Sequence, residues 1–164
     1  MAPGTAGHWL GTDAFGRFDV LAHLAAVLRR KDTIDDVTED DWDFQLDVNL
    51  KATFFLNRSA AHLFREQGRG GRIVNFTSQG WWTGGFGGSI VYNATKGGIV
   101  TMTRGLARTY AAAGIRVNAL APGLVDTRML VDDLPPERLD ELVAQVPLGR
   151  MATPEEIAPA AVFL

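Results

Sequence analysis

Tyr92 and Lys96 are two residues that could do chemistry together, and they stand four positions apart in the stretch "VYNATKGGIV". Side chains at this spacing share one face of a helix. An ammonium about 4 Å from a phenol contributes roughly 4 kcal/mol at an effective dielectric constant near 20, or close to three pKa units before desolvation opposes it. The pair could therefore donate and accept a proton near neutral pH. Taken alone, the spacing also fits a surface helix with an incidental lysine.

Two further polar residues could join this chemistry. Ser78 ends a predicted strand fourteen residues before Tyr92, where its hydroxyl could donate to a carbonyl oxygen, although a serine in a strand-end turn would look the same. Asn49 falls inside a long predicted helix, where asparagine is disfavoured because its side chain competes for backbone hydrogen bonds. It could order a water molecule beside Lys96, or it could be a solvated side chain.

The composition excludes several classes of protein. The chain has 164 residues, which favours one domain, with 46% hydrophobic and 21% charged residues. A formal charge of -3 argues against nucleic-acid binding. The absence of cysteine removes disulfides, thiol catalysis and thiolate metal sites, and we expect no metal site. We find neither a secretory signal nor an apolar run of the roughly 18 residues that a membrane span needs, so the expected location is cytoplasmic.

Hydrophobic periodicity predicts an alternation of strands and helices. Buried strands are expected at 18–27, 72–78 and 115–122. Helices are expected from a capping box at Thr38 to about Phe64 and from about Tyr92 to Ala113. A Gly-rich loop, a polar stretch with weak helical character and a last helix capped by Thr153 follow at 79–89, 126–150 and 153–164. This order predicts an α/β fold with a parallel sheet, whose chemistry lies at the carboxyl ends of the strands.

The stretches "YNATK", "IVNFTS", "DVNL", "FGRFDVL" and "RVNALAPGLVDT" together resemble the short-chain dehydrogenase/reductase family. The resemblance runs from about Phe15 to Leu164, and five motifs in the family's order and spacing are specific. It implies a partial, doubly wound Rossmann-type parallel sheet with flanking helices, whose strands match the family's fourth to sixth. Residues 18–164 would be the C-terminal part of a Rossmann-fold domain, and residues 1–17 an irregular segment.

The resemblance also implies a role for each candidate residue. Tyr92 would be the catalytic acid/base, and Lys96 would lower its pKa and hold the nicotinamide ribose. Ser78 would polarise the substrate carbonyl, and Asn49 would order a water in the proton relay. The implied reaction is hydride transfer between NAD or NADP and a small carbonyl compound or secondary alcohol. The residues implied to line the nicotinamide are Pro122, Gly123, Val125 and Thr127.

The chain departs from the family's pattern in two places. The family opens with a strand and the turn Thr-Gly-x-x-x-Gly-x-Gly, which holds the pyrophosphate at a helix N-terminus. The nearest match, residues 7–13, follows no predicted strand, and we interpret it as chance. Weak or absent binding of NAD or NADP is therefore expected. The second departure is "HLAA" at 23–26, where the family has Asn-Asn-Ala-Gly; we interpret His23 as a strand-end histidine instead of a catalytic base.

Several residues keep two interpretations. Trp81 and Trp82, which follow Gln79 after Ser78, could wall a substrate pocket or plug a subunit contact. Arg29 and Arg30 could meet an acidic substrate such as a sugar acid or keto acid, or they could be a solvated basic pair.

The partners and the overall activity also keep alternatives. An unpaired apolar edge is expected at residues 18–24, and it favours self-association. By resemblance, the helices that begin near Asp41 and Tyr92 would pair in a homo-oligomer. Two other functions stay open: a catalytically inactive, truncated remnant, and an interaction module that caps an intact relative.

Overall fold

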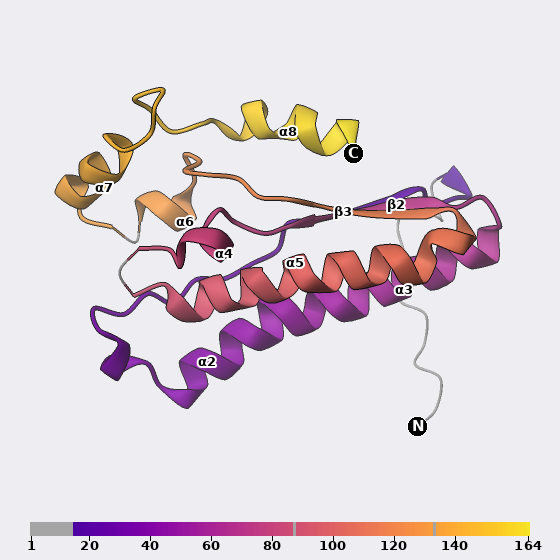
Figure 1. Ribbon diagram of the computed structural model, residues 1–164, viewed down its shortest axis with the longest axis horizontal. Coiled ribbons are helices and arrows are strands. Elements are labelled where there is room, and N and C mark those ends of the chain that lie inside the picture. Colours follow the sequence, from indigo (N-terminus) through magenta and orange to yellow (C-terminus); the bar gives the residue numbers. More distant parts are fainter. Residues whose placement is uncertain (1–14, 87, 133) are drawn as a thin grey trace.

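One parallel sheet organises the protein, as the sequence predicts. The computed structural model describes residues 15–86, 88–132 and 134–164 (Figure 1). The described strands pair in the order β1–β2–β3, with Val20 opposite Arg72 and Arg72 opposite Arg116. Residues 7–13, whose glycine match we interpret as chance, and all but the last three residues of the segment 1–17 lie outside the described residues. The strands are β1 (Val20–His23), β2 (Gly71–Phe76) and β3 (Ile115–Leu120).

Two long helical segments cover one face of this sheet (Figure 1). The first combines α2 (Glu39–Gln45), a π-helical stretch η2 (Leu46–Lys51) and α3 (Ala52–Gln67). It begins with the predicted capping box, because the Thr38 N–H donates to an Asp41 carboxylate oxygen at 3.1 Å and the Asp41 N–H donates to Thr38 Oγ1 at 3.1 Å. The second is α5 (Ile90–Tyr110), which continues as the 3₁₀ turn η3 (Ala111–Ala113).

Shorter elements fill the connections. The C-terminal helix lies on the side of the sheet opposite α3 and α5 (Figure 1). It begins at the predicted cap, where the Thr153 N–H donates to Glu156 Oε2 at 2.9 Å. No helix in the described parts of the chain is long and apolar enough to cross a membrane. The shorter elements that connect the strands and long helices are η1 (Ile34–Asp36), α4 (Gly80–Thr83), α6 (Arg128–Val131), α7 (Pro136–Val143) and α8 (Pro154–Phe163).

The apolar core lies between the sheet and the layer formed by α3 and α5. Phe64 of α3 is fully buried and stacks on Phe18, with ring centroids 5.4 Å apart. Gly71 begins β2 directly under this ring, and a Cβ there would lie 2.4 Å from the Phe64 ring. The glycine therefore lets strand and helix approach closely. Buried partners from the three strands and α5 complete the cluster: Leu21, Ile73, Ile115, Val117, Leu106 and Tyr110.

A buried polar contact continues this layer toward the carboxyl ends of the strands. Asn57 of α3 and Asn75 of β2 are both fully buried, and each donates its amide N–H to the other's Oδ1, at 2.8 and 3.0 Å. Asn75 also donates to Thr103 Oγ1 of α5 at 3.1 Å. The three elements are thereby joined by satisfied hydrogen bonds, which fix their register more specifically than apolar packing alone.

Strand β1 is shorter than the predicted strand at 18–27. Beyond His23, side-chain amides take the place of a neighbouring strand. Asn49 accepts from the Val27 N–H at 2.8 Å and donates to the Val27 carbonyl at 2.9 Å, and Gln45 Oε1 accepts from the Arg29 N–H at 3.1 Å. The segment is therefore held to the helices and not to the sheet. In the described chain β1 is an edge strand, and Val20 is 44% exposed, as the predicted apolar edge requires.

Candidate active site

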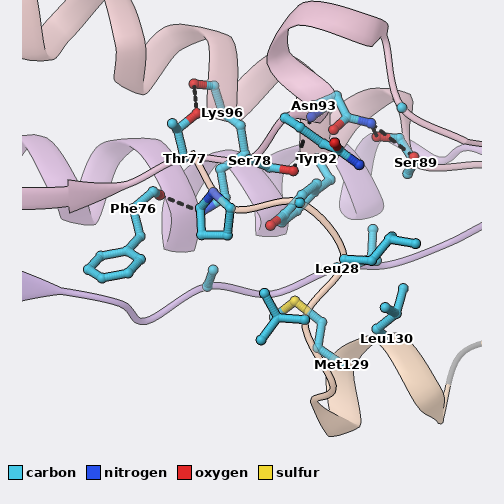
Figure 2. Close-up of a pocket in the computed structure, with 18 of the residues that line it drawn as sticks. Leu28, Phe76, Thr77, Ser78, Ser89, Tyr92, Asn93, Lys96, Met129 and Leu130 are labelled. Carbon is cyan, nitrogen blue, oxygen red and sulfur yellow. Dashed lines mark hydrogen bonds between the residues drawn. The ribbon is translucent and has the colours of Figure 1, made fainter. Parts of the chain in front are cut away.

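A cavity of ≈ 320 Å³ lies where the predicted chemistry should be, beyond the carboxyl ends of the three strands (Figure 2). Its walls come from the segments that follow β1, β2 and β3, together with the start of α5 and helix α6. Parallel strands bring these strand-end segments to one edge of the sheet. The cavity contains three of the four predicted catalytic residues: Ser78, Tyr92 and Lys96.

Ser78 stands two residues beyond β2, and its side chain lies near Tyr92 in Figure 2. The Gly80 N–H donates to Ser78 Oγ at 3.1 Å. The hydroxyl oxygen is therefore fixed as an acceptor from the backbone, which leaves its O–H to be donated elsewhere. This orientation suits a hydroxyl that donates to a substrate oxygen.

Tyr92 is placed by the loop that precedes α5. The adjacent Asn93 donates to the Gly84 carbonyl at 3.1 Å and to the Ser89 carbonyl at 2.8 Å, so the loop wraps around its amide. A Cβ at Gly85 would lie 1.8 Å from Asn93 Nδ2, which explains a glycine at that point. The Gly-rich stretch thus packs closely against the first turn of α5, and this packing fixes the position of Tyr92 beside the cavity.

Lys96 is buried, with 3% of its surface exposed, and its Nζ donates to the Phe76 carbonyl at 2.9 Å (Figure 2). Its own carbonyl accepts from Thr77 Oγ1 at 2.8 Å. Both contacts tie the first turns of α5 to the end of β2. Burial lowers the pKa of Lys96 to about 8, because desolvation disfavours the ammonium form.

The sequence argument for a lowered Tyr92 pKa is wrong for this arrangement. Lys96 Nζ lies 5.2 Å from the centre of the Tyr92 ring, on its face, while its hydrogen bond goes to Phe76. Burial raises the pKa of Tyr92 above its ordinary value of 10.0. The residues share a helix face as predicted, but the ammonium is directed to a backbone carbonyl.

Asn49 is fully buried within the π-helical stretch, so the interpretation as a solvated side chain is wrong. Besides Val27, its amide donates to Thr95 Oγ1 of α5 at 3.2 Å. Its own carbonyl accepts from Thr53 Oγ1 at 2.5 Å. Asn49 therefore joins the segment after β1 to the residue next to Lys96, and its role in ordering a water stays a prediction.

The residues predicted to line the nicotinamide all border the cavity. Gln79 borders it as well, and its N–H donates to the Pro122 carbonyl at 2.9 Å, which holds the loops after β2 and β3 together. Trp81 and Trp82 do not border it, and Trp82 is 79% exposed. Their interpretation as the wall of this cavity is not supported. The bordering residues from the loop after β3 include Pro122, Gly123, Val125 and Thr127.

His23 does not border the cavity. It lies at the end of β1, as interpreted, and its Nε2 is buried with no hydrogen-bond partner among the described residues. Burial, and secondarily the charge of Lys96, lowers the pKa of His23.

The sequence reasoning missed the apolar residues that complete the cavity. Leu28, Met129 and Leu130 lie across from Tyr92 in Figure 2. Leu28 follows β1, and the other two belong to the short helix α6. One signal in the sequence could have found α6. Thr127 comes just before a short apolar run, and a threonine at such a place is a typical N-cap, as it is here.

Comparisons with known proteins agree with this geometry. A family model described as "Enoyl-(Acyl carrier protein) reductase" matches residues 11–164. A (2S)-[(R)-hydroxy(phenyl)methyl]succinyl-CoA dehydrogenase subunit of Thauera aromatica is 40% identical over 93% of this chain and 59% of its own. A 2-dehydro-3-deoxy-D-gluconate 5-dehydrogenase of Dickeya dadantii is 36% identical over 92% of this chain and 59% of its own.

A solved structure from Sinorhizobium meliloti 1021, assigned to the short-chain alcohol dehydrogenases, is similar along most of the chain. It superposes with a TM-score of 0.86 at 32% identity, covering 94% of this chain and 61% of that one. This chain thus spans about three fifths of the length of the relatives it matches. The sequence matches, the sheet topology and the cavity at the strand ends all agree with one family. The chain belongs to the short-chain dehydrogenase/reductase family.

Proposed function

We propose that this chain carries the catalytic half of an NAD(P)-dependent oxidoreductase, which interconverts a small carbonyl compound and the corresponding secondary alcohol. The observation that carries the proposal is the shared cavity of Ser78, Tyr92 and Lys96 beyond the ends of the parallel strands. Both curated relatives named above are dehydrogenases, which supports the same reaction class.

In the reducing direction, the substrate carbonyl oxygen would accept hydrogen bonds from Ser78 and Tyr92. Ser78 has its O–H available, since its Oγ already accepts from the Gly80 N–H. Tyr92 is fully protonated at neutral pH because burial raises its pKa, so it can transfer its proton as negative charge develops on the oxygen. Lys96 carries positive charge close by, which favours the phenolate that remains.

The described residues fit the nicotinamide end of the cofactor and not its phosphates. The loop after β3 and the buried Lys96 border the cavity and would hold the nicotinamide and its ribose. The cofactor supplies or removes a hydride at the substrate carbon when bound. The pyrophosphate-binding turn of the family follows a strand ahead of β1, and no such strand is among the described residues. Binding by this chain is therefore expected to be weak.

A chimera tests the proposal. This chain would be joined to the parts of the Thauera aromatica relative that the match leaves uncovered. The expected result is NADH- or NADPH-dependent reduction of small ketones, lost on substitution of Tyr92→Phe. A folded chimera that binds the cofactor but reduces no ketone, with or without Tyr92, would reject the proposal.

An interaction module is the second candidate, and exposed aromatic residues on the first helical segment favour it. Trp42, Phe54 and Phe55 are 45%, 40% and 43% exposed, and Phe54 packs edge to face on Phe55. Exposed apolar side chains that gather on a surface commonly mark a protein contact. The two functions are compatible, because this surface does not belong to the cavity.

A further inference from the structure

Lys96 differs from the other two lysines of the chain in the group that its side chain binds. Lys31 and Lys51 each place Nζ 2.9 Å from an aspartate carboxylate oxygen. Lys96 Nζ instead donates to a neutral group, the Phe76 carbonyl, at 2.9 Å. A carboxylate favours the ammonium form of a lysine, whereas a carbonyl oxygen carries no net charge to offset the cost of burial.

The surroundings of Lys96 also favour its neutral form. Lys96 borders the cavity, and none of the described residues along that border is an aspartate or glutamate. The larger side chains there include Phe86 and Met129. Two further titratable groups are near: Arg30 borders the cavity and donates to the Phe86 carbonyl at 3.4 Å, and His23 is close enough for the charge of Lys96 to lower its pKa. Desolvation by such surroundings disfavours an ammonium and leaves more of the nucleophilic amine.

The neutral amine is present in quantity near neutral pH. Burial lowers the pKa of Lys96 from 10.5 to about 8. At pH 7 about 10% of Lys96 is then the neutral amine, against roughly 0.03% of a lysine with the ordinary pKa. A lysine desolvated in an apolar pocket is one of the ways in which proteins obtain an amine that attacks carbonyl compounds.

Two hydroxyl groups stand beside this amine. Ser78, Tyr92 and Lys96 lie together at the cavity (Figure 2). The Ser78 O–H is available to a carbonyl oxygen, since its Oγ already accepts from the Gly80 N–H at 3.1 Å. Lys96 Nζ lies 5.2 Å from the centre of the Tyr92 ring, and Tyr92 is protonated because burial raises its pKa. A carbonyl group in the cavity would thus meet an amine, a hydrogen-bond donor and a proton donor.

We propose that Lys96 is a nucleophile that forms a covalent imine with small, apolar ketones and aldehydes in this cavity, without a nicotinamide cofactor. The nitrogen lone pair forms the C–N bond as the carbonyl π electrons move to oxygen. The nitrogen passes one proton to this oxygen, and Tyr92 supplies a second, with which the oxygen leaves as water while the C=N bond closes. The Tyr92 phenolate then takes back the proton that remains on the nitrogen. Hydrolysis reverses these steps, and no oxidant or reductant takes part.

The volume and lining of the cavity set the class of compound. At ≈ 320 Å³, the cavity is at the lower end of the range for small-molecule sites, and its border is largely apolar. Small, uncharged carbonyl compounds therefore fit best. The imine goes beyond the proposed function, in which the same lysine would hold the nicotinamide ribose, so a bound cofactor would compete with it.

Acetylacetone tests this on the chain as it stands. This diketone condenses with a neutral amine with loss of one water, and the imine rearranges to a conjugated enaminone that resists hydrolysis and absorbs at longer wavelength than tryptophan. At pH 7 we expect mass spectrometry of the peptides to locate one enaminone on Lys96. Lys51, which is exposed, is the internal reference, and Lys96 should react at least about 10-fold faster. The same peptides distinguish the N-terminal amine, which is reactive because its ordinary pKa is about 8.

Four substitutions locate the reaction in the cavity. Lys96→Met removes the nitrogen and should abolish the enaminone at this position, whereas Lys51→Met is the matched control and should leave it unchanged. Met129→Trp adds volume at the border of the cavity and should slow the reaction of Lys96 but not that of Lys51. Tyr92→Phe removes the proton donor and should slow the reaction of Lys96 at least about 10-fold. The mapped position in the unmodified chain gives the answer even if a variant fails to fold.

The outcomes separate the imine from the proposed function. No enaminone on Lys96, equal rates at Lys96 and Lys51, or a rate that Met129→Trp leaves unchanged would overturn the proposal. A chimera that reduces ketones, together with a chain that forms no enaminone on Lys96, would leave the proposed function standing and reject only the imine. An enaminone on Lys96, with a chimera that binds the cofactor but reduces no ketone, would support the imine and reject the oxidoreductase.

Discussion

Lys96 Nζ lies 5.2 Å from the centre of the Tyr92 ring and donates its hydrogen bond to the Phe76 carbonyl at 2.9 Å. The ammonium is thus on the face of the ring and is anchored to the end of β2. Burial, and not the position of Lys96, favours the protonated phenol, which is the form that gives a proton to a carbonyl oxygen. For alcohol oxidation the phenol must lose its proton, and the positive charge of Lys96 at the ring favours the phenolate that forms.

The first prediction is that Tyr92 titrates above pH 10 in this chain, because burial disfavours the phenolate. The measurement is the ¹³Cζ shift of the two tyrosines against pH, with Tyr92→Phe used to assign the signal. Lys96→Met should change the midpoint little, because Lys96, with its pKa of about 8, has already lost its charge at that pH. A midpoint well below 10 would show that the ammonium already reaches the phenolate oxygen.

The second prediction is that Lys96→Met stabilises the fold. Burial lowers the pKa of Lys96 from 10.5 to about 8, so holding the ammonium in the folded state costs about 3 kcal/mol. Methionine removes this cost but leaves the Phe76 carbonyl without its donor, which costs about 1–3 kcal/mol. The net gain at pH 7 should be about 1 kcal/mol, measured by urea unfolding.

The pH dependence of this gain distinguishes its cause. Between pH 8 and 10.5 the unfolded chain binds the Lys96 proton while the folded chain has lost it, so the stability of the unmodified protein rises with pH. The advantage of Lys96→Met should be complete below pH 8 and shrink above it. Lys51→Met is the control, because Lys51 is exposed and its pair with Asp47 contributes little. A constant advantage across this range would point to better packing instead.

Hydrophobic periodicity and capping signals predicted most of the fold. The capping box of Thr38 and Asp41, the three strands and the two long helical segments are where the sequence places them, within a few residues at their ends. These features follow from short-range patterns of residue types, which can be recognised in the sequence without knowledge of distant contacts. The motif order then placed Ser78 and Tyr92 at one sheet edge.

Long-range hydrogen bonds could not be predicted in the same way. Asn57 and Asn75 can be buried because each satisfies the hydrogen-bonding groups of the other's amide. Nothing in the two separate sequence segments shows that these residues pair. The same holds for Asn49 and Gln45, whose amides replace a strand partner and so shorten β1. The direction of Lys96 also depends on a carbonyl twenty residues away, which helical spacing alone does not specify.

The third prediction concerns catalysis in the chimera. Tyr92→Phe removes the transferable proton, and Lys96→Met removes the charge that favours the phenolate. Each should nearly abolish turnover, and the double substitution should be little worse than either single one, because both residues serve one step. The measurement is alcohol oxidation at saturating cofactor. Strictly additive losses would show that the two residues act in separate steps.

The fourth prediction is that this chain alone binds NAD(H) and NADP(H) more weakly than the micromolar range. Under the proposed function the cavity would hold only the nicotinamide end of the cofactor, while backbone N–H groups at a helix N-terminus normally hold the pyrophosphate. Calorimetric titration of both cofactors gives the affinity, and the chimera serves as the positive control. A micromolar Kd for the chain alone would contradict the prediction.

The last prediction is that the chain self-associates through the first helical segment. Phe54 and Phe55 are 40% and 43% exposed and lie edge to face, with ring centroids 5.3 Å apart. Such aromatic groups commonly dominate contacts between subunits. Phe54→Lys should therefore weaken association about 10-fold or more, as measured by sedimentation over a range of concentrations. Leu148→Lys is the control, because Leu148 is 79% exposed but lies outside these helices.

Val20→Lys tests the edge of β1, since a charge there blocks pairing between sheet edges. If Val20→Lys dissociates the assembly and Phe54→Lys does not, the contact runs through the open sheet edge, and the helix surface serves another partner.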